Sequence, residues 1–164
     1  MPYFHRKPTR LKNYNYSQSG IYFITLCSQN RVPLFSSISE NSATIHLSEY
    51  GHIIEKYLHE IPKTYDYLQI DHYVIMPDHI HLLLQISRNS ALSDTQNQVK
   101  EISPANQRLP NIISTLKRFT NKAAGFNLWQ RSYYDHIVRD EHDYLNIWQY
   151  IEENPLRWLQ KNRI

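Results

Sequence analysis

Residues 69–86 constrain the fold most, because they read as two strands joined by a tight turn. Residues 69–76 and 79–86 are rich in apolar side chains, and a Pro-Asp pair separates them. Alternate residues of a strand project from the same face, so His79 and His81 are predicted to lie side by side. The opposite face then carries Ile80, Leu82, Leu84 and Ile86. One face can fill a core, and the other can hold a metal ion.

A bare His-x-His pair fits two interpretations. The two histidines can be hydrogen-bonded residues at the edge of a core, because imidazole is intermediate in burial. They can also be metal ligands, and a short motif of this kind does not decide between the two. The rest of the chain must decide.

The order of predicted elements indicates the fold class. Two antiparallel strands at 69–86 lie between further elements: a strand at 21–27, a helix at 48–61 that stops at Pro62, a helix at 111–124, a strand at 132–139 and a helix at 141–154. This β-α-β-β-α-β-α order predicts an α+β fold of the ferredoxin-like, split βαβ type. We expect an antiparallel sheet with helices on one face and an additional C-terminal helix.

Length and composition limit the classes of protein to consider. The 164 residues fit one domain, in which residues 1–19 form a polar, basic arm and residues 87–106, rich in Ser, Asn, Gln and Asp, form a mobile loop. The single cysteine, Cys27, excludes an intrachain disulfide and fits a reducing compartment. No apolar stretch approaches the roughly 20 residues that span a bilayer. We therefore expect a soluble, cytoplasmic protein that does not enter membranes.

The distribution of charge favours a polyanionic partner. The net charge is only +3, but residues 1–39 and 102–134 contain no acidic residue. Basic side chains in such windows can contact phosphates, while tyrosine and tryptophan side chains can stack on unpaired bases. A solvated basic surface with buried aromatic residues is the alternative. The candidates for DNA contacts are Arg6, Lys7, Arg10, Lys12, Lys117, Arg118 and Lys122.

The last predicted helix carries a second pair of candidate residues. Tyr150 and Asn154 are four residues apart, so they share one helix face. Pro155 disfavours helical geometry at the preceding residue, which predicts that the helix ends at Asn154. Asn154 can therefore be a simple C-cap, and Tyr150 can simply flank the core.

Four segments in this order resemble the REP-associated tyrosine transposases, which are single-tyrosine members of the HUH transposases. The resemblance covers nearly the whole chain except residues 87–106. The segments that carry it are Arg-Leu-Lys-Asn-Tyr-Asn-Tyr-Ser-Gln-Ser-Gly-Ile-Tyr-Phe-Ile-Thr (10–25), Met-Pro-Asp-His-Ile-His-Leu-Leu (76–83), Trp-Gln-Arg-Ser-Tyr-Tyr-Asp-His-Ile-Val-Arg-Asp (129–140) and Tyr-Ile-Glu-Glu-Asn-Pro (150–155).

The resemblance implies an activity and a role for each matching residue. Members of this family cleave single-stranded DNA beside hairpins through a covalent 5′-phosphotyrosine link, and they can rejoin strands afterwards. Tyr150 matches the nucleophile, whereas His79, His81 and Asn154 match the ligands of a divalent ion. Two imidazoles and an amide oxygen suit Mg²⁺ or Mn²⁺, and the nitrogen ligands favour Mn²⁺ of the two; zinc is the alternative.

Two questions stay open at this point. The REP-associated group resembles monomers, whereas compact insertion-sequence relatives are dimers that exchange the tyrosine helix, so the chain is expected to be a monomer or a homodimer. A domesticated member of the family that binds nucleic acid through the same fold without cutting it is the alternative to a transposase.

Overall fold

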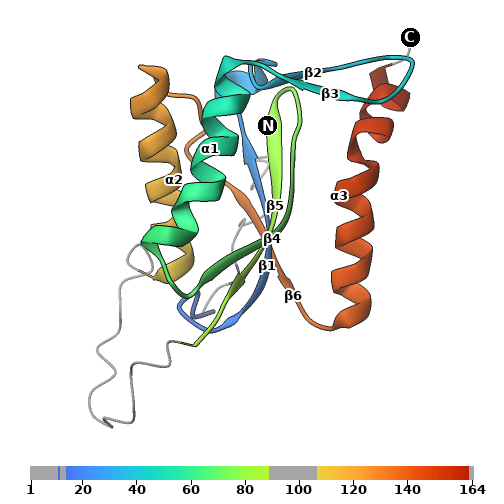
Figure 1. The fold of residues 1–164 in the computed structure, drawn as a ribbon. Helices are drawn as coiled ribbons and strands as arrows, with labels where there is room; N and C mark the ends of the chain where they lie inside the picture. Colours follow the sequence, from blue (N-terminus) through green and yellow to red (C-terminus); the bar gives the residue numbers. More distant parts are fainter. Residues whose placement is uncertain (1–10, 12–13, 89–106, 163–164) are drawn as a thin grey trace, which may run out of the picture.

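The computed structural model describes residue 11 and residues 14–88 and 107–162 (Figure 1). The elements appear in the predicted order, with a short hairpin inserted after the first strand. They are β1 (Gly20–Cys27), the 3-10 helix η1 (Gln29–Arg31), β2 (Ser36–Ile38), β3 (Ile45–Leu47), α1 (Glu49–Thr64), β4 (Leu68–Ile75), β5 (His79–Ile86), α2 (Arg108–Ala124), β6 (Tyr134–Val138) and α3 (Glu141–Asn162). No helix among these described residues is long and apolar enough to cross a membrane.

The main sheet has the strand order β4-β5-β1-β6, and every neighbouring pair is antiparallel. This is the order of a split βαβ fold, so the predicted fold class is confirmed. Helices α1 and α2 lie together on one face of the sheet, and α3 lies alone on the other (Figure 1). The sheet therefore has two buried faces, and the face under α3 carries the two histidines.

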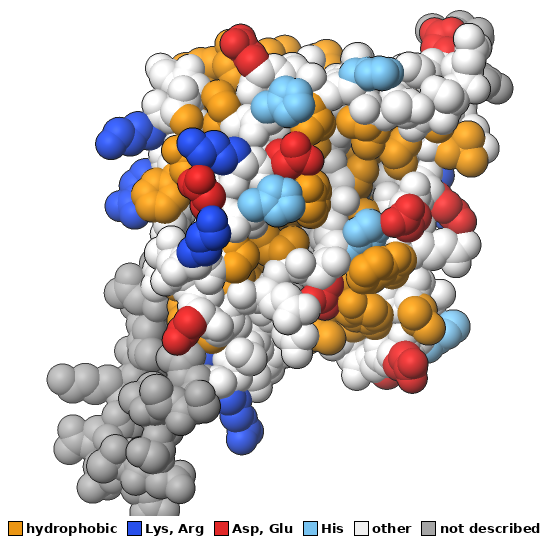
Figure 2. Space-filling model, viewed as in Figure 1, with side chains coloured by type: hydrophobic (Ala, Val, Ile, Leu, Met, Phe, Trp, Pro, Cys, Tyr) orange, Lys and Arg blue, Asp and Glu red, His pale blue; other side chains and the backbone are white. Residues whose placement is uncertain are grey.

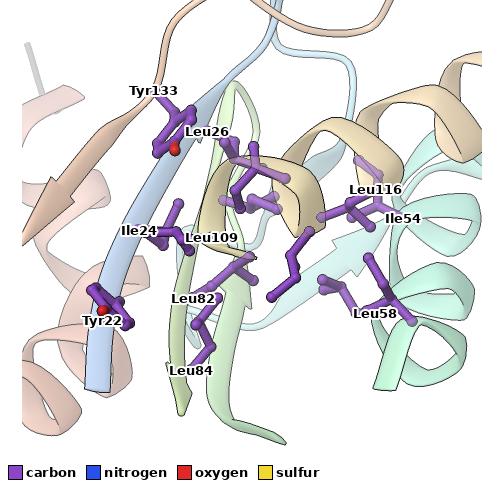
Figure 3. Close-up of a cluster of buried hydrophobic side chains, with 14 of the residues drawn as sticks. Tyr22, Ile24, Leu26, Ile54, Leu58, Leu82, Leu84, Leu109, Leu116 and Tyr133 are labelled. Atoms are coloured by element: carbon purple, nitrogen blue, oxygen red, sulfur yellow. The ribbon is translucent and has the colours of Figure 1, made fainter. Parts of the chain in front are cut away.

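The larger core lies between the sheet and the α1–α2 layer (Figure 3). Successive residues of a strand alternate between faces, which sends one set of β1 and β5 side chains into this core. That set includes Tyr22, Ile24, Leu26, Ile80, Leu82, Leu84 and Ile86, which pack with Ile54 and Leu58 of α1 and with Leu109 and Leu116 of α2. Burial of these side chains provides most of the hydrophobic stabilisation of the sheet.

A second, smaller core holds α3 against the opposite face of the sheet. Its buried members are Phe23, Val74, Met76, Leu83, Ile147 and Ile151, with Tyr144, Trp148, Trp158, Ile38 and Ile45 partly buried around them. The apolar stripe predicted to dock the last helix is part of this cluster. A bulge between Ile70 and His72 sets the β4 register that pairs Val74 with His81.

Two helices run past the prolines at which they were predicted to stop. Helix α1 continues through Pro62 to Thr64, and α3 continues through Pro155 to Asn162. A proline removes its own backbone hydrogen bond and crowds the carbonyl four residues before it, and tertiary packing can offset this cost. In α3, the turn after Pro155 is held by the packing of Trp158 and by the ion pair between Arg157 and Glu153. Asn154 therefore lies inside the helix, and the prediction of a helix end at this residue was wrong.

The β2–β3 hairpin was not predicted, because strands of three residues are too short to show a periodic pattern. The described end of the predicted basic arm is also packed rather than extended. Tyr16 is buried, its N–H donates to Gln107 Oε1 at 2.7 Å, and its carbonyl accepts from Leu109. Residues 1–10 and 12–13 of the arm and 89–106 of the predicted loop lie outside the described residues.

Candidate active site

The two histidines of β5 lie together on the sheet face that α3 covers. In the antiparallel register, His81 faces Thr25 and His79 faces Cys27, both on β1. The exposed fractions of the histidines are only 8% for His79 and 5% for His81, and their ring centroids are 4.7 Å apart. Alternation along β5 therefore places two buried imidazoles side by side, as the sequence pattern predicts.

His79 is held by the residue before it in the chain. Its Nδ1 donates to Asp78 Oδ1 at 2.6 Å, because an ionised carboxylate can only accept. The second oxygen of Asp78 lies 3.0 Å from Arg31 Nε. The side chain of Asn154, from α3, also lies near the His79 ring and raises the pKa of this histidine. With Nδ1 protonated, Nε2 keeps its lone pair, which is the arrangement of a histidine that binds a metal.

His81 is held at one nitrogen and unpaired at the other. Its Nδ1 shares a hydrogen bond of 2.8 Å with the hydroxyl of Thr25, and its ring stacks on Phe23. Its Nε2 is buried and has no hydrogen-bond partner among the described residues. A buried polar atom without a partner costs free energy, and such atoms in native structures often mark the place of an ion or a functional contact.

The surroundings keep both imidazoles neutral. Burial lowers the pKa of His81 to about 3, with further lowering from the neighbouring His79 and from Arg31. Burial also lowers the pKa of His79, although its hydrogen bond to Asp78 acts in the opposite direction. The neutral imidazole is the form that coordinates metal ions. Both side chains are therefore in their metal-binding state at neutral pH.

Tyr150 extends from α3 beside these histidines. Its ring centroid lies 5.3 Å from that of His81 and 6.0 Å from that of Phe23. The guanidinium of Arg157 lies over the ring at 5.6 Å. Tyr150 is 38% exposed, whereas Asn154, one helical turn later, is only 6% exposed. One turn of α3 thus points an amide toward His79 and leaves a phenol accessible beside His81.

The side chains at this site could hold a divalent cation and leave coordination positions open. His79, His81 and Asn154 would supply two imidazole nitrogens and an amide oxygen, and the unpartnered Nε2 of His81 gives such an ion a place to bind. Within the described residues, no group of three or more His, Cys, Asp and Glu side chains is arranged to hold a metal.

The three predicted DNA-binding residues that the structure describes do not lie at this site. Lys117 Nζ donates to the carbonyls of Gln130 and Arg131, so it secures the segment before β6. Arg118 and Lys122 are exposed on α2, on the opposite side of the sheet from the histidines. Most Lys and Arg side chains visible in Figure 2 lie over the α1–α2 side. Arg6, Lys7, Arg10 and Lys12 lie outside the described residues. Their contacts with DNA stay predictions.

Two further histidines hold α3 against the sheet. His136 Nε2 lies 2.8 Å from Asp143 Oδ2, which links β6 to the first turn of α3. His72 stacks on Trp148 with ring centroids 4.2 Å apart, and its Nε2 lies 2.7 Å from Glu152 Oε1. Both contacts fix the helix that carries Tyr150.

Sequence reasoning missed the residues that orient the histidines. Asp78 is adjacent to His79 in the chain, and this adjacency is the one signal that could have identified it. Thr25 and Arg31 lie about fifty residues earlier, and only the β1–β5 register brings them to the site. That register is not readable from residue spacing.

Comparisons with known proteins agree with the geometry. The profile of the family described as Transposase IS200 like matches residues 17–154. An uncharacterized protein of Haemophilus influenzae is 35% identical over 167 residues, covering 95% of this chain and 91% of that protein. A REP-associated tyrosine transposase of Escherichia coli K12 is 23% identical over 148 residues, covering 89% of this chain and 73% of the relative.

A solved structure shares the fold. The structure of a REP-associated tyrosine transposase bound to a REP hairpin superposes with a TM-score of 0.62 at 18% sequence identity. The match covers 90% of this chain and 73% of that one.

Proposed function

The chain belongs to the IS200-like transposase family, and we propose that it is an enzyme that cuts and rejoins single-stranded DNA beside hairpins. In this proposal Tyr150 is the nucleophile, and His79, His81 and Asn154 hold Mg²⁺ or Mn²⁺. The hairpin partner is suggested by the relative that was solved with a REP hairpin.

The chemistry requires both a nucleophile and a way to offset phosphate charge. A phenol, with an ordinary pKa of about 10, is a weak nucleophile at neutral pH, and the phosphodiester anion repels it. When bound, a divalent cation supplies charge stabilisation to the non-bridging phosphate oxygens. The protein provides the neutral imidazoles that such an ion needs, in a buried setting that favours their neutral form.

The proposed bond changes start from Tyr150 as the nucleophile. Its oxygen, deprotonated as it attacks, bonds to phosphorus, and the bond between phosphorus and the 3′ oxygen breaks. The 3′ oxygen takes the electron pair and a proton from solvent to become a hydroxyl, while the 5′ strand end remains on the protein as a phosphotyrosine. Because a phosphodiester is exchanged for a phosphodiester, the hydroxyl can reverse the reaction and rejoin strands without an external energy source.

The observation that carries the proposal is the convergence of Tyr150 and Asn154, from α3, on His79 and His81, from β5, within one chain. Tyr150 is exposed beside two buried histidines, one of which has an unpartnered nitrogen. A module that only binds nucleic acid does not require this arrangement. The geometry therefore favours the enzyme over the binding module.

The test is a search for a covalent adduct. Purified protein is incubated with a pool of single-stranded hairpin DNAs labelled on the 3′ side of possible cleavage sites, with Mg²⁺ or Mn²⁺, and then separated under denaturing conditions. We expect a labelled adduct that is absent with EDTA and with Tyr150→Phe. Tight binding of hairpins by the wild-type protein without any adduct would support the binding module instead.

A further inference from the structure

One positively charged side chain, that of Arg31, lies at the end of the candidate active site that is farther from Tyr150. Arg31 follows β1, and its Nη1 donates to Cys27 Sγ at 2.7 Å while its Nε lies 3.0 Å from Asp78 Oδ2. Cys27 faces His79 across the β1–β5 strand pair, and Asp78 directly precedes His79 in the chain. The guanidinium therefore lies beside His79. Its charge is among the causes that lower the pKa of both histidines, which agrees with this closeness.

Tyr150 occupies the other end. Its ring contacts His81 and Phe23. Both residues lie farther from Arg31 along the paired strands than Cys27 and His79 do. Along this face the order is Tyr150, then the two histidines, then Arg31. Nucleophile and leaving oxygen lie on opposite sides of phosphorus in an in-line displacement. A phosphate bound between Tyr150 and Arg31 at the histidines would direct its leaving oxygen toward the guanidinium.

The backbone around Arg31 is built to hold this position. Asn30 and Arg31 have φ values of 56° and 58°, a left-handed conformation that non-glycine residues adopt rarely. The turn is fixed by hydrogen bonds from Arg31 N to Ser28 O and from Ser28 Oγ to Val32 O. Strained residues that persist in this way cluster at functional sites.

The guanidinium of Arg31 can still donate a hydrogen bond to a substrate oxygen. The Arg31 side chain is 49% exposed, and its Nη2 has no hydrogen-bond partner among the described residues. Arg157, the cation near Tyr150, is at the nucleophile side and is paired with Glu153. An arginine presents fixed donors that match phosphate-type oxygens, and it does not lose its proton in proteins.

We propose that Arg31 is a catalytic residue that stabilises the negative charge developing on the 3′ oxygen as the bond between phosphorus and this oxygen breaks. This inference rests on the proposed function. The guanidinium donates a hydrogen bond to the departing oxygen and keeps its own proton, so water supplies the proton that completes the 3′-hydroxyl. In rejoining, the same contact orients the attacking hydroxyl.

The test compares two leaving groups at one cleavage site. A hairpin cleaved in the adduct assay is prepared with either oxygen or sulfur as the bridging 3′ atom, and single-turnover rates are measured. A thiolate needs little stabilisation, because an ordinary thiol has a pKa of about 8.5. We expect Arg31→Ala to slow adduct formation about 100-fold with oxygen and less than about threefold with sulfur, each relative to wild type. Arg31→Lys, which keeps the charge, should be intermediate with oxygen.

Two variants provide controls. His79→Asn removes a proposed metal ligand but leaves both contacts of the guanidinium, to Asp78 and Cys27, in place, so it should slow both substrates equally. Arg88→Ala, at an exposed arginine after β5, should change neither rate. Mn²⁺ affinity, measured by calorimetry, should change less than about threefold in Arg31→Ala.

The possible outcomes separate the two proposals. Equal slowing of both substrates by Arg31→Ala, together with a Mn²⁺ affinity weakened about tenfold or more, would show that Arg31 acts only through Asp78 and His79 and would overturn the inference. An unchanged rate with the oxygen substrate would also overturn it. A wild-type protein that forms no adduct with either substrate would instead overturn the proposed function, and the inference with it.

Discussion

The side chain of Asn154 in α3 lies beside the ring of His79 in β5 and raises the pKa of this histidine. This contact joins the helix that carries Tyr150 to the strand that carries the histidine pair. It exists because α3 continues through Pro155, which keeps Asn154 inside the helix and pointed at the sheet. The nucleophile and the proposed metal ligands are thus brought together by one helical turn.

Replacing Asn154 tests its proposed role as a ligand. We expect Asn154→Ala to weaken Mn²⁺ binding about tenfold, because an oxygen donor is lost while both imidazoles remain. Calorimetric titration measures the affinity. Asn146→Ala, at an exposed position on the same helix, is the matched control and should bind Mn²⁺ like the wild type. Equal affinities for the two variants would remove Asn154 from the ligand set.

Asp78→Asn tests the orientation of His79. The carboxylate fixes the proton on His79 Nδ1 and increases the basicity of Nε2, and loss of such partners typically weakens metal binding by about 10- to 100-fold. We expect a loss of Mn²⁺ affinity in this range without a change in the far-UV circular dichroism spectrum. Asp66→Asn, at an exposed turn residue, should have no effect. An unchanged affinity in Asp78→Asn would contradict this account of His79.

The buried histidines predict how stability depends on pH in the absence of metal. Their pKa values are lowered in the folded protein, to about 3 for His81, so the unfolded chain binds more protons once the pH falls below about 6.5. The free energy of unfolding should therefore fall as the pH is lowered from about 6.5, with His81 contributing a slope approaching about 1.4 kcal/mol per pH unit. Urea unfolding in EDTA measures this. The slope should be smaller in His81→Asn, and an identical slope would contradict the prediction.

Gly51 tests the packing of α1 against the segment before β2. A Cβ at this position would collide with the carbonyl oxygen of Phe35, which is backbone and has little freedom to move. We expect Gly51→Ala to destabilise the protein by about 2 kcal/mol or more, although alanine normally favours a helix interior by about 1 kcal/mol. Thermal unfolding measures the change. Unchanged or increased stability would show that the helix moves freely at this contact.

The sequence allowed the regular parts of the fold to be predicted. The apolar run in residues 79–86 is typical of a strand buried on both faces, and the helical spacing in 111–124 is typical of a helix with one buried face. The β2–β3 hairpin lacked such a signal. The continuation of α3 past Pro155 could not be predicted either, since it depends on the packing of Trp158, a tertiary contact.

Some residues of the candidate site could be predicted from the sequence, and others could not. His79 and His81 were found as a pair from their spacing, and Tyr150 with Asn154 from theirs, but nothing in the spacing joins one pair to the other. The resemblance to a family supplied that connection, and the structure places the four together. Thr25 and Arg31 were missed because the pairing of β1 with β5 brings them to the site. Lys117 donates to backbone carbonyls, and its contact with DNA stays a prediction.

Identification of the residue that bears the DNA tests the central claim most directly. The denaturation-resistant adduct would be digested with trypsin and nuclease, and the modified peptide would be sequenced by mass spectrometry. The account predicts a nucleotide joined through its 5′ phosphate to Tyr150. Attachment to any other residue, such as the neighbouring Tyr144 on α3 or Tyr134 on β6, would contradict it.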